Sequence, residues 1–138
     1  NASFADNQGV GTIVDDDPPL LATEENSQRA IALNSLFFLR DPFSITNPIF
    51  SGPDQRTRVA LFATNLIVTP GMVVTAEAID SQQVTHQLPV EFIGSLPTFP
   101  GFTQLNVKLP DGITVAGDMQ VSINVNGRKS NIVLVGVN

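Results

Sequence analysis

Three adjacent carboxylates form the clearest candidate for chemistry in the sequence. Asp15, Asp16 and Asp17 follow a short apolar run and precede two prolines. Like charges this close repel one another, and a hard divalent cation would relieve the repulsion, but Ca²⁺ takes about six to eight oxygen ligands. The run therefore fits two alternatives: a partial Ca²⁺ site that needs ligands from elsewhere, or a solvated acidic turn.

Catalytic groups of the usual kinds are sparse. His86 is the only histidine, and its neighbours Thr85 and Gln87 form no nucleophile motif, so a Ser–His pair of the hydrolase type would depend on this one residue. The other candidate carboxylates mostly stand at turns, where Asp is favoured because it hydrogen-bonds the local backbone. They are Asp41, Asp54, Glu77, Glu91, Asp111 and Asp118. This pattern indicates structural roles, and we expect no enzymatic activity.

Four further side chains could recognise a partner. Arg56 and Arg58 stand two residues apart, so alternation along an extended chain places both on one outer face. They suit either a carboxylated partner or a local ion pair with Asp54. Phe99 and Phe102 stand in or beside a loop marked by Pro and Gly, and are the aromatic residues there that could make a contact.

Composition narrows the class of protein. The chain has 138 residues, enough for one well-buried core and too few for two ordinary domains with a linker. The formal net charge is −6 and the seven Lys and Arg residues are scattered, which argues against a nucleic-acid partner. Cysteine is absent, and no apolar run approaches the roughly 20 residues that cross a bilayer, so we expect no membrane insertion.

The last third of the chain, residues 102–137, sets the architecture that must position these side chains. It contains three apolar alternations separated by turn signals, and strict alternation is typical of strands with one buried face. The expected inward residues are Leu105, Val107 and Leu109; Met119, Val121, Ile123 and Val125; and Ile132 and Leu134. We expect an antiparallel meander in which Asn126 and Gly127 make a tight turn, because both tolerate positive φ.

Upstream strands must cover the apolar face of this meander. Four runs are expected to form them, over residues 29–39, 58–66, 72–79 and 84–93, with an edge strand or a bulge at Pro89. The expected inward residues are Ile31, Leu33, Phe37 and Leu39; Val59, Leu61 and Ala63; and Leu88, Val90 and Phe92. The sequence therefore predicts an all-β protein, an immunoglobulin-like antiparallel β-sandwich of seven to eight strands with an N-terminal extension strand.

Residues 1–19 form a short element of their own, with an expected strand from Val10 to Val14. The run Ala5-Asp6, Gly9, Gly11-Thr12-Ile13 and Asp15-Asp16-Asp17 resembles the closing strand of a Calx-β domain, a calcium-associated β-sandwich repeat of extracellular proteins. The resemblance implies that further Ca²⁺ ligands come from loops outside this segment. Residues 20–28 are polar and are expected to form a linker, so the strand has no sheet of its own to join.

Motifs spread over the rest of the chain carry a second resemblance. They are Asp41-Pro42-Phe43, Asp54-Gln55-Arg56-Thr57-Arg58, Leu61-Phe62-Ala63-Thr64-Asn65-Leu66, Leu88-Pro89-Val90-Glu91, Thr103-Gln104-Leu105, Leu109-Pro110, Ala116-Gly117-Asp118 and Ser130-Asn131. Together, residues 29–138 resemble an uncharacterised C-terminal Ig-like module of large bacterial surface proteins. This resemblance implies secretion, a location outside the cell or on its surface, and a non-catalytic role.

Two functions from different classes follow. The first is a structural module, either the terminal domain of a surface protein or a filament subunit, whose partner is a second copy or the rest of a larger surface protein. Phe4, Val10, Ile13 and Val14 would form its assembly strand, donated to a neighbour or docked on its own domain. The alternative is a carbohydrate-binding or adhesive accessory module. The absence of Trp and Tyr, which stack on sugar rings, counts against it.

Overall fold

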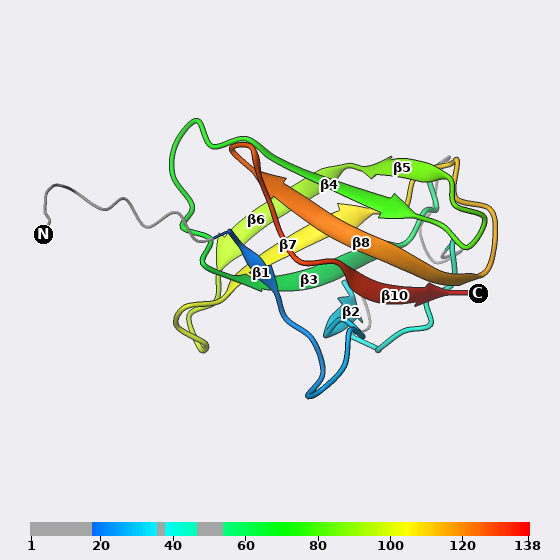
Figure 1. The fold of residues 1–138 in the computed structure, drawn as a ribbon, viewed down its shortest axis with the longest axis horizontal. Coiled ribbons are helices and arrows are strands. Elements are labelled where there is room, and N and C mark those ends of the chain that lie inside the picture. The colour runs from blue at the N-terminus through cyan, green and yellow to red at the C-terminus, as the bar shows by residue number, and fades with distance from the viewer. Residues whose placement is uncertain (1–17, 36–37, 47–53) are drawn as a thin grey trace, which may run out of the picture.

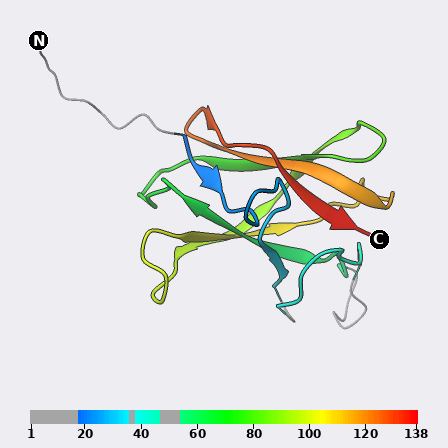
Figure 2. The same ribbon diagram turned by 60° about the horizontal axis from the view of Figure 1, so that its bottom comes forward.

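The structure is a computed structural model that describes residues 18–35, 38–46 and 54–138. These residues form two antiparallel sheets packed face to face, and no helix occurs among them (Figure 1, Figure 2). The strands are β1 (Leu20–Leu21), β2 (Ala32–Asn34), β3 (Arg58–Thr64), β4 (Val74–Ile79), β5 (Thr85–Leu88), β6 (Val90–Ser95), β7 (Thr103–Lys108), β8 (Gly117–Val125), β9 (Arg128–Lys129) and β10 (Val133–Val137). The predicted all-β sandwich is confirmed, although the strands are more numerous and several are short.

The first sheet has the strand order β1-β3-β7-β6, with β2 also paired to β3, and the second has the order β10-β8-β4-β5, with β9 also paired to β8. The expected meander over residues 102–137 is wrong, because β7 and β8 lie in opposite sheets. The chain crosses between them over residues 109–116, where Leu109 and Ile113 are buried. Pro110 does begin a turn, as predicted, but this turn leads into a crossover that buries Ile113 instead of into a hairpin.

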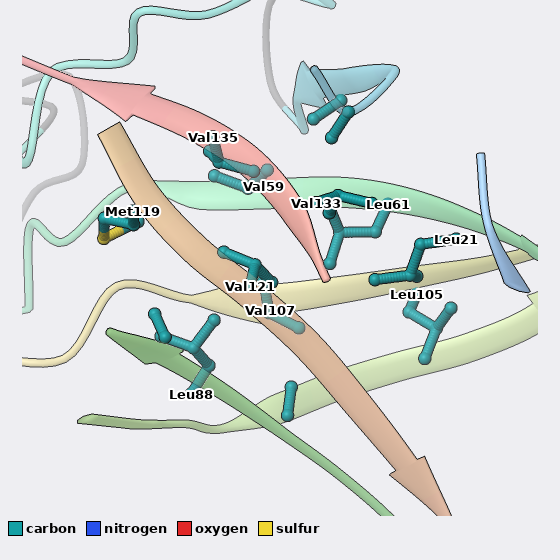
Figure 3. Close-up of a cluster of buried hydrophobic side chains, with 14 of the residues drawn as sticks. Leu21, Val59, Leu61, Leu88, Leu105, Val107, Met119, Val121, Val133 and Val135 are labelled. Carbon is teal, nitrogen blue, oxygen red and sulfur yellow. The ribbon is translucent and has the colours of Figure 1, made fainter. Parts of the chain in front are cut away.

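The core lies between the sheets and consists of side chains that alternate inward along the long strands (Figure 3). Several predicted inward residues are no more than 1% exposed: Val59, Leu61 and Ala63 of β3, Leu105 and Val107 of β7, and Met119, Val121 and Ile123 of β8. Fully burying a side chain such as Val, Leu or Ile stabilises the folded state by about 1.5–3 kcal/mol. The alternation therefore predicts these three strands correctly.

The last strand is shifted by one residue from the prediction. Asn126 and Gly127 have φ of 51° and 89°, and this tight turn pairs Val125 with Arg128, as expected. An uninterrupted hairpin would then place Ile132 and Leu134 inward, but Val133 pairs with Val121, one residue out of that register. The extra residue moves Val133, Val135 and Val137 into the core.

Pro89 lies between two strands, β5 and β6, and not within a single strand. β5 is the edge of the second sheet and β6 is the edge of the first, so the chain changes sheet at this proline. Leu88 is buried, as predicted, but the β6–β7 pairing is irregular between Val90 and Phe92. This bulge turns Phe92 outward, where it is 50% exposed, and leaves Ile93 against the core. The predicted edge position is confirmed and the bulge lies just after Pro89, whereas the single strand over residues 84–93 and the inward position of Phe92 are wrong.

The segment before β3 packs differently from the prediction. Leu21 is buried and pairs with Ala63, so the linker expected over residues 20–28 is wrong at its first residues. The side-chain amide of Asn131 also clamps the backbone of Leu21, accepting from its N–H at 2.8 Å and donating to its carbonyl at 3.1 Å.

The inward face of the run at residues 29–39 was also predicted one residue out of place. Ala30 and Ala32 are the buried residues, whereas Ile31 and Leu39 are exposed and Leu33 is half-buried. Phe37 lies outside the described residues. Both faces of this run are apolar, and the face with the smaller side chains points into the core.

Two short segments cover the outer edge of β10. Ala30 donates its backbone N–H to the carbonyl of Leu134 at 2.9 Å, and Leu134 donates to Gln28 at 2.7 Å. Further along, Phe43 donates to Gly136 at 2.9 Å. Within the described residues, β5 and β6 each pair with a single strand, so one edge of each sheet stays open.

Candidate functional site

The two arginines singled out in the sequence lie close together but do different work. Arg58 extends from β3 and bonds Glu91 at 2.9 Å and Asp54 at 3.0 Å, and Lys108 bonds the same Asp54 oxygen at 2.7 Å. Hydrogen bonds from Lys108 and Arg58 hold the pKa of Asp54 well below its ordinary value. The local ion pair between Arg58 and Asp54 is thus present, as part of a larger charged cluster.

Arg56 turns its guanidinium group back onto the protein. It donates to the carbonyl oxygens of Leu109, Pro110 and Ile113, and its side chain is only 12% exposed. These carbonyls belong to the crossover between β7 and β8, which forms no ladder that could satisfy them. Arg56 therefore braces the crossover, and it does not share one outer face with Arg58.

A second charged cluster ties the N-terminal segment to β8 and β10. Arg29 donates to Asp41 Oδ2 at 2.8 Å and binds both oxygens of Asp118, at 2.8 and 2.9 Å. Asp41 Oδ2 also accepts the backbone N–H of Gly136 at 2.9 Å. The hydrogen bonds from Arg29 lower the pKa of Asp118, and the two carboxylates raise the pKa of Arg29.

His86 belongs to a pair that shapes the loop between β4 and β5. Its Nε2 lies 2.8 Å from Asp80 Oδ2, and Asp80 Oδ1 accepts the backbone N–H groups of Gln82 and Val84. Both side chains are largely buried, at 11% and 5% exposure. An ionised carboxylate only accepts hydrogen bonds, so Nε2 bears the proton, and the pair holds the loop.

Stability is expected to fall in acid in a way that depends on Asp80. The hydrogen bond from His86, followed by the amide of Val84, lowers the pKa of Asp80 below its ordinary 3.8. A carboxyl whose pKa is lower when folded stabilises the fold above its unfolded pKa, and this contribution is lost as the pH falls toward the folded pKa. Urea midpoints measured from about pH 6 to about pH 2.5 should therefore drop steeply below about pH 4.

The Asp80→Asn variant should start from a lower urea midpoint and show a shallower fall in acid. Asp111→Asn is the matched control, because the Asp111 side chain is 95% exposed, and it should keep the wild-type profile. Equal acid profiles for wild type and Asp80→Asn would show that this carboxylate does not contribute.

Phe99 and Phe102 lie at the opposite end of the sandwich from Arg56 and Arg58, so the four predicted residues do not form one surface. The β6–β7 loop that contains Phe99 is folded by its own turns: Phe99 N–H donates to Leu96 at 3.3 Å, and Phe102 N–H donates to Phe99 at 3.2 Å. This loop presents Phe99 at 61% exposure.

The loop forms one wall of an apolar hollow of about 310 Å³, here called the proximal groove. Its other wall and floor come from β2 and β3, and Thr98 is the one polar residue in its lining. The main lining side chains are Ile31, Leu33, Phe62, Leu96, Phe99 and Phe102. Such a surface suits an apolar side chain, since it offers almost nothing to the hydroxyl groups of a sugar.

A second, larger hollow of about 590 Å³ adjoins the proximal groove and shares Phe102 with it. It is bordered by Ile67 and Val68 of the β3–β4 loop, which are 81% and 47% exposed. Together with Leu20 and Phe99, these residues place exposed apolar surface at the end where β1 begins. Figure 1 shows β1 and both loops at that end, opposite the C-terminus.

The predicted Ca²⁺ residues Asp15, Asp16 and Asp17 and the predicted assembly residues Phe4, Val10, Ile13 and Val14 lie outside the described residues. Among the described residues, no group of three or more His, Asp or Glu side chains is placed to hold a metal ion. No described helix is long and apolar enough to cross a membrane.

Comparisons with protein-family models, curated proteins and solved structures find no match to this chain. The two resemblances therefore rest on the residues that carry them.

Proposed function

We propose that the protein is a non-catalytic structural module of a secreted or surface protein, or a filament subunit, that associates with neighbouring copies through its N-terminal segment. The observation that carries the proposal is the apolar surface at one end of the sandwich, where β1 begins and the proximal groove lies, here called the proximal end. Ile67, Phe99 and Leu20 are 81%, 61% and 44% exposed there, beside two adjoining hollows. Contiguous exposed apolar surface on a soluble domain is typical of an interaction site.

The charged residues support a structural role. Arg29, Arg56 and Arg58 are each engaged with carboxylates or carbonyls of distant strands and loops. His86 and Asp80 hold a loop. Each of these groups fixes the geometry of the sandwich, which is consistent with a structural role.

The arrangement of the chain also supports assembly in a row. Pro18 lies at the proximal end, where Asn65 Nδ2 reaches its carbonyl at 3.5 Å. Asn138 follows β10 at the opposite end, and both views show this separation (Figure 1, Figure 2). Donation of the N-terminal segment from each copy to the next, without reciprocal exchange, would repeat without closing. The open edges of β5 and β6 offer backbone groups to a donated strand.

Removing residues 1–17 tests the proposal. The shortened chain should remain folded, because the buried core of the described part of the chain lies within residues 21–137, and it should be monomeric while the full chain associates. Electron microscopy and sedimentation velocity of the two chains at equal concentration would show the difference. Continued assembly of the shortened chain would rule out the N-terminal segment as its basis, and unfolding would show that the segment belongs to its own sandwich.

A further inference from the structure

We propose that the proximal groove of one copy holds the Phe4 side chain of a second copy. The inference rests on the proposed function, and it names the acceptor site that self-association would use. The groove is apolar along its two walls and floor, and its volume of about 310 Å³ suffices for one aromatic side chain with part of its neighbours. Phe4 is the only aromatic residue among residues 1–17.

The proximal groove is preformed, because backbone hydrogen bonds fix its floor and one of its walls. Ala22 donates its N–H to Phe62 at 2.7 Å, and Ile31 donates to Ala22 at 3.0 Å, which fixes the floor against β3. Leu96 donates to the carbonyl of Phe102 at 3.2 Å, and this bond closes the loop that forms the opposite wall. A rigid apolar site loses little conformational freedom on binding, so an inserted ring gains most of its burial energy.

The position of Pro18 makes residues 1–17 the available occupant. Pro18 stands at the proximal end beside Asn65, and the second hollow, which adjoins the groove through Phe102, includes Asn65 in its lining. Pro18 stands fourteen positions after Phe4, and fourteen steps of an extended chain span about 46–50 Å. Phe4 can therefore reach the same end of a neighbouring copy.

The direction of the chain favours a second copy over the groove of the same chain. β1 is antiparallel to β3, and Leu20 lies opposite Thr64 at the proximal end of that strand. The direction of β1 therefore points out of the sandwich at Pro18, and Pro19 disfavours a helical turn at Pro18 because proline restricts the residue before it. Insertion of Phe4 into its own groove would require the chain to reverse between Phe4 and Pro18, whereas insertion into a second copy would not.

Sedimentation velocity of the full chain and three point variants tests the pairing. Phe4→Ser and Phe99→Ala should each weaken self-association by about tenfold or more, as truncation of a central aromatic contact commonly does. Phe92→Ala is the matched control, because this ring is 50% exposed but lies outside the groove, and it should leave association unchanged. If the wild type associates and Phe4→Ser and Phe99→Ala associate equally well, the groove proposal is overturned while self-association stands. If the wild type stays monomeric, both proposals fail.

Disulfide trapping locates the contact, since the native chain has no cysteine. Copies with Ala5→Cys mixed with copies with Thr98→Cys should form a disulfide-linked dimer under mild oxidation, because a disulfide needs Cα atoms within about 7 Å. Gln82→Cys, in an exposed loop at the opposite end, replaces Thr98→Cys as the control and should not form one. Equal trapping at residue 82 would overturn the proposal. So would a disulfide that forms only within single chains containing both Ala5→Cys and Thr98→Cys.

Discussion

Val121→Asp is expected to leave the chain unfolded at room temperature. Val121 is 1% exposed on β8, between Ala78 of β4 and Val133 of β10, and Figure 3 shows it among the core side chains. An aspartate here would bury a charge among apolar atoms with no partner, at a cost of several kcal/mol. The total stability of a domain is roughly 5–15 kcal/mol. Circular dichroism and a urea titration would measure the loss. Ile123→Asp should act in the same way.

Gln120→Asp provides the matched control. Gln120 precedes Val121 on the same strand and is exposed on the opposite face, so the same new carboxylate should stay hydrated and leave the chain folded. Phe99→Ala should also melt close to the wild type, because the Phe99 ring is mostly in solvent. If Val121→Asp were as stable as wild type, the register of β8 would have to be shifted by one residue.

Arg29→Gln is expected to lower the free energy of unfolding by about 2–3 kcal/mol, less than the roughly 3–5 kcal/mol found when a fully buried ion pair loses one partner. Its guanidinium group serves two carboxylates, and the Asp41 side chain is only 9% exposed. Without Arg29, the Asp41 carboxylate still accepts the N–H of Gly136, but no guanidinium group balances its negative charge. The same change loosens the segment that covers the edge of β10. Urea unfolding at neutral pH would give the difference.

Arg40→Gln is the matched control for Arg29→Gln. Arg40 bonds Glu24 at 2.7 Å and the carbonyl of Ala30 at 3.0 Å, but the side chains of Arg40 and Glu24 are exposed, at 40% and 47%. An exposed pair of this kind contributes about 0–1 kcal/mol. Equal losses from the two variants would mean that the Arg29 cluster is no more than a surface contact.

The pattern of apolar residues determined three of the long strands, β3, β7 and β8. In β3, β7 and β8 one face is apolar and the other contains polar residues, so alternation alone identifies Val59, Leu105 and Val121 as core residues. The sequence also predicted the Asn126-Gly127 turn, because few other dipeptides accept positive φ at both positions. The local sequence is enough to predict the core residues of a strand when the apolar side chains are concentrated on one of its faces.

The tertiary structure alone decided which sheet each strand joins. Nothing local distinguishes a turn that returns along the same sheet from a crossover, and the burial of Ile113 between the sheets selects the crossover. The one-residue shift before β10 and the bulge at Phe92 also could not be predicted from the sequence. In both places one residue is left unpaired, and the apolar alternation does not reveal such a residue until the partner strand is known.

The proximal groove could not be predicted from the sequence, for two physical reasons. Ile31 and Leu33 face outward because Ala30 and Ala32 occupy the core, and alternation cannot choose between two apolar faces of one run. The groove also joins β2, β3 and the β6–β7 loop, which are far apart along the chain. The sequence determined that Phe99 and Phe102 stand in or beside a loop, and only the pairing of β3 with β2 and β7 within the first sheet decided that this loop and Phe62 line one site.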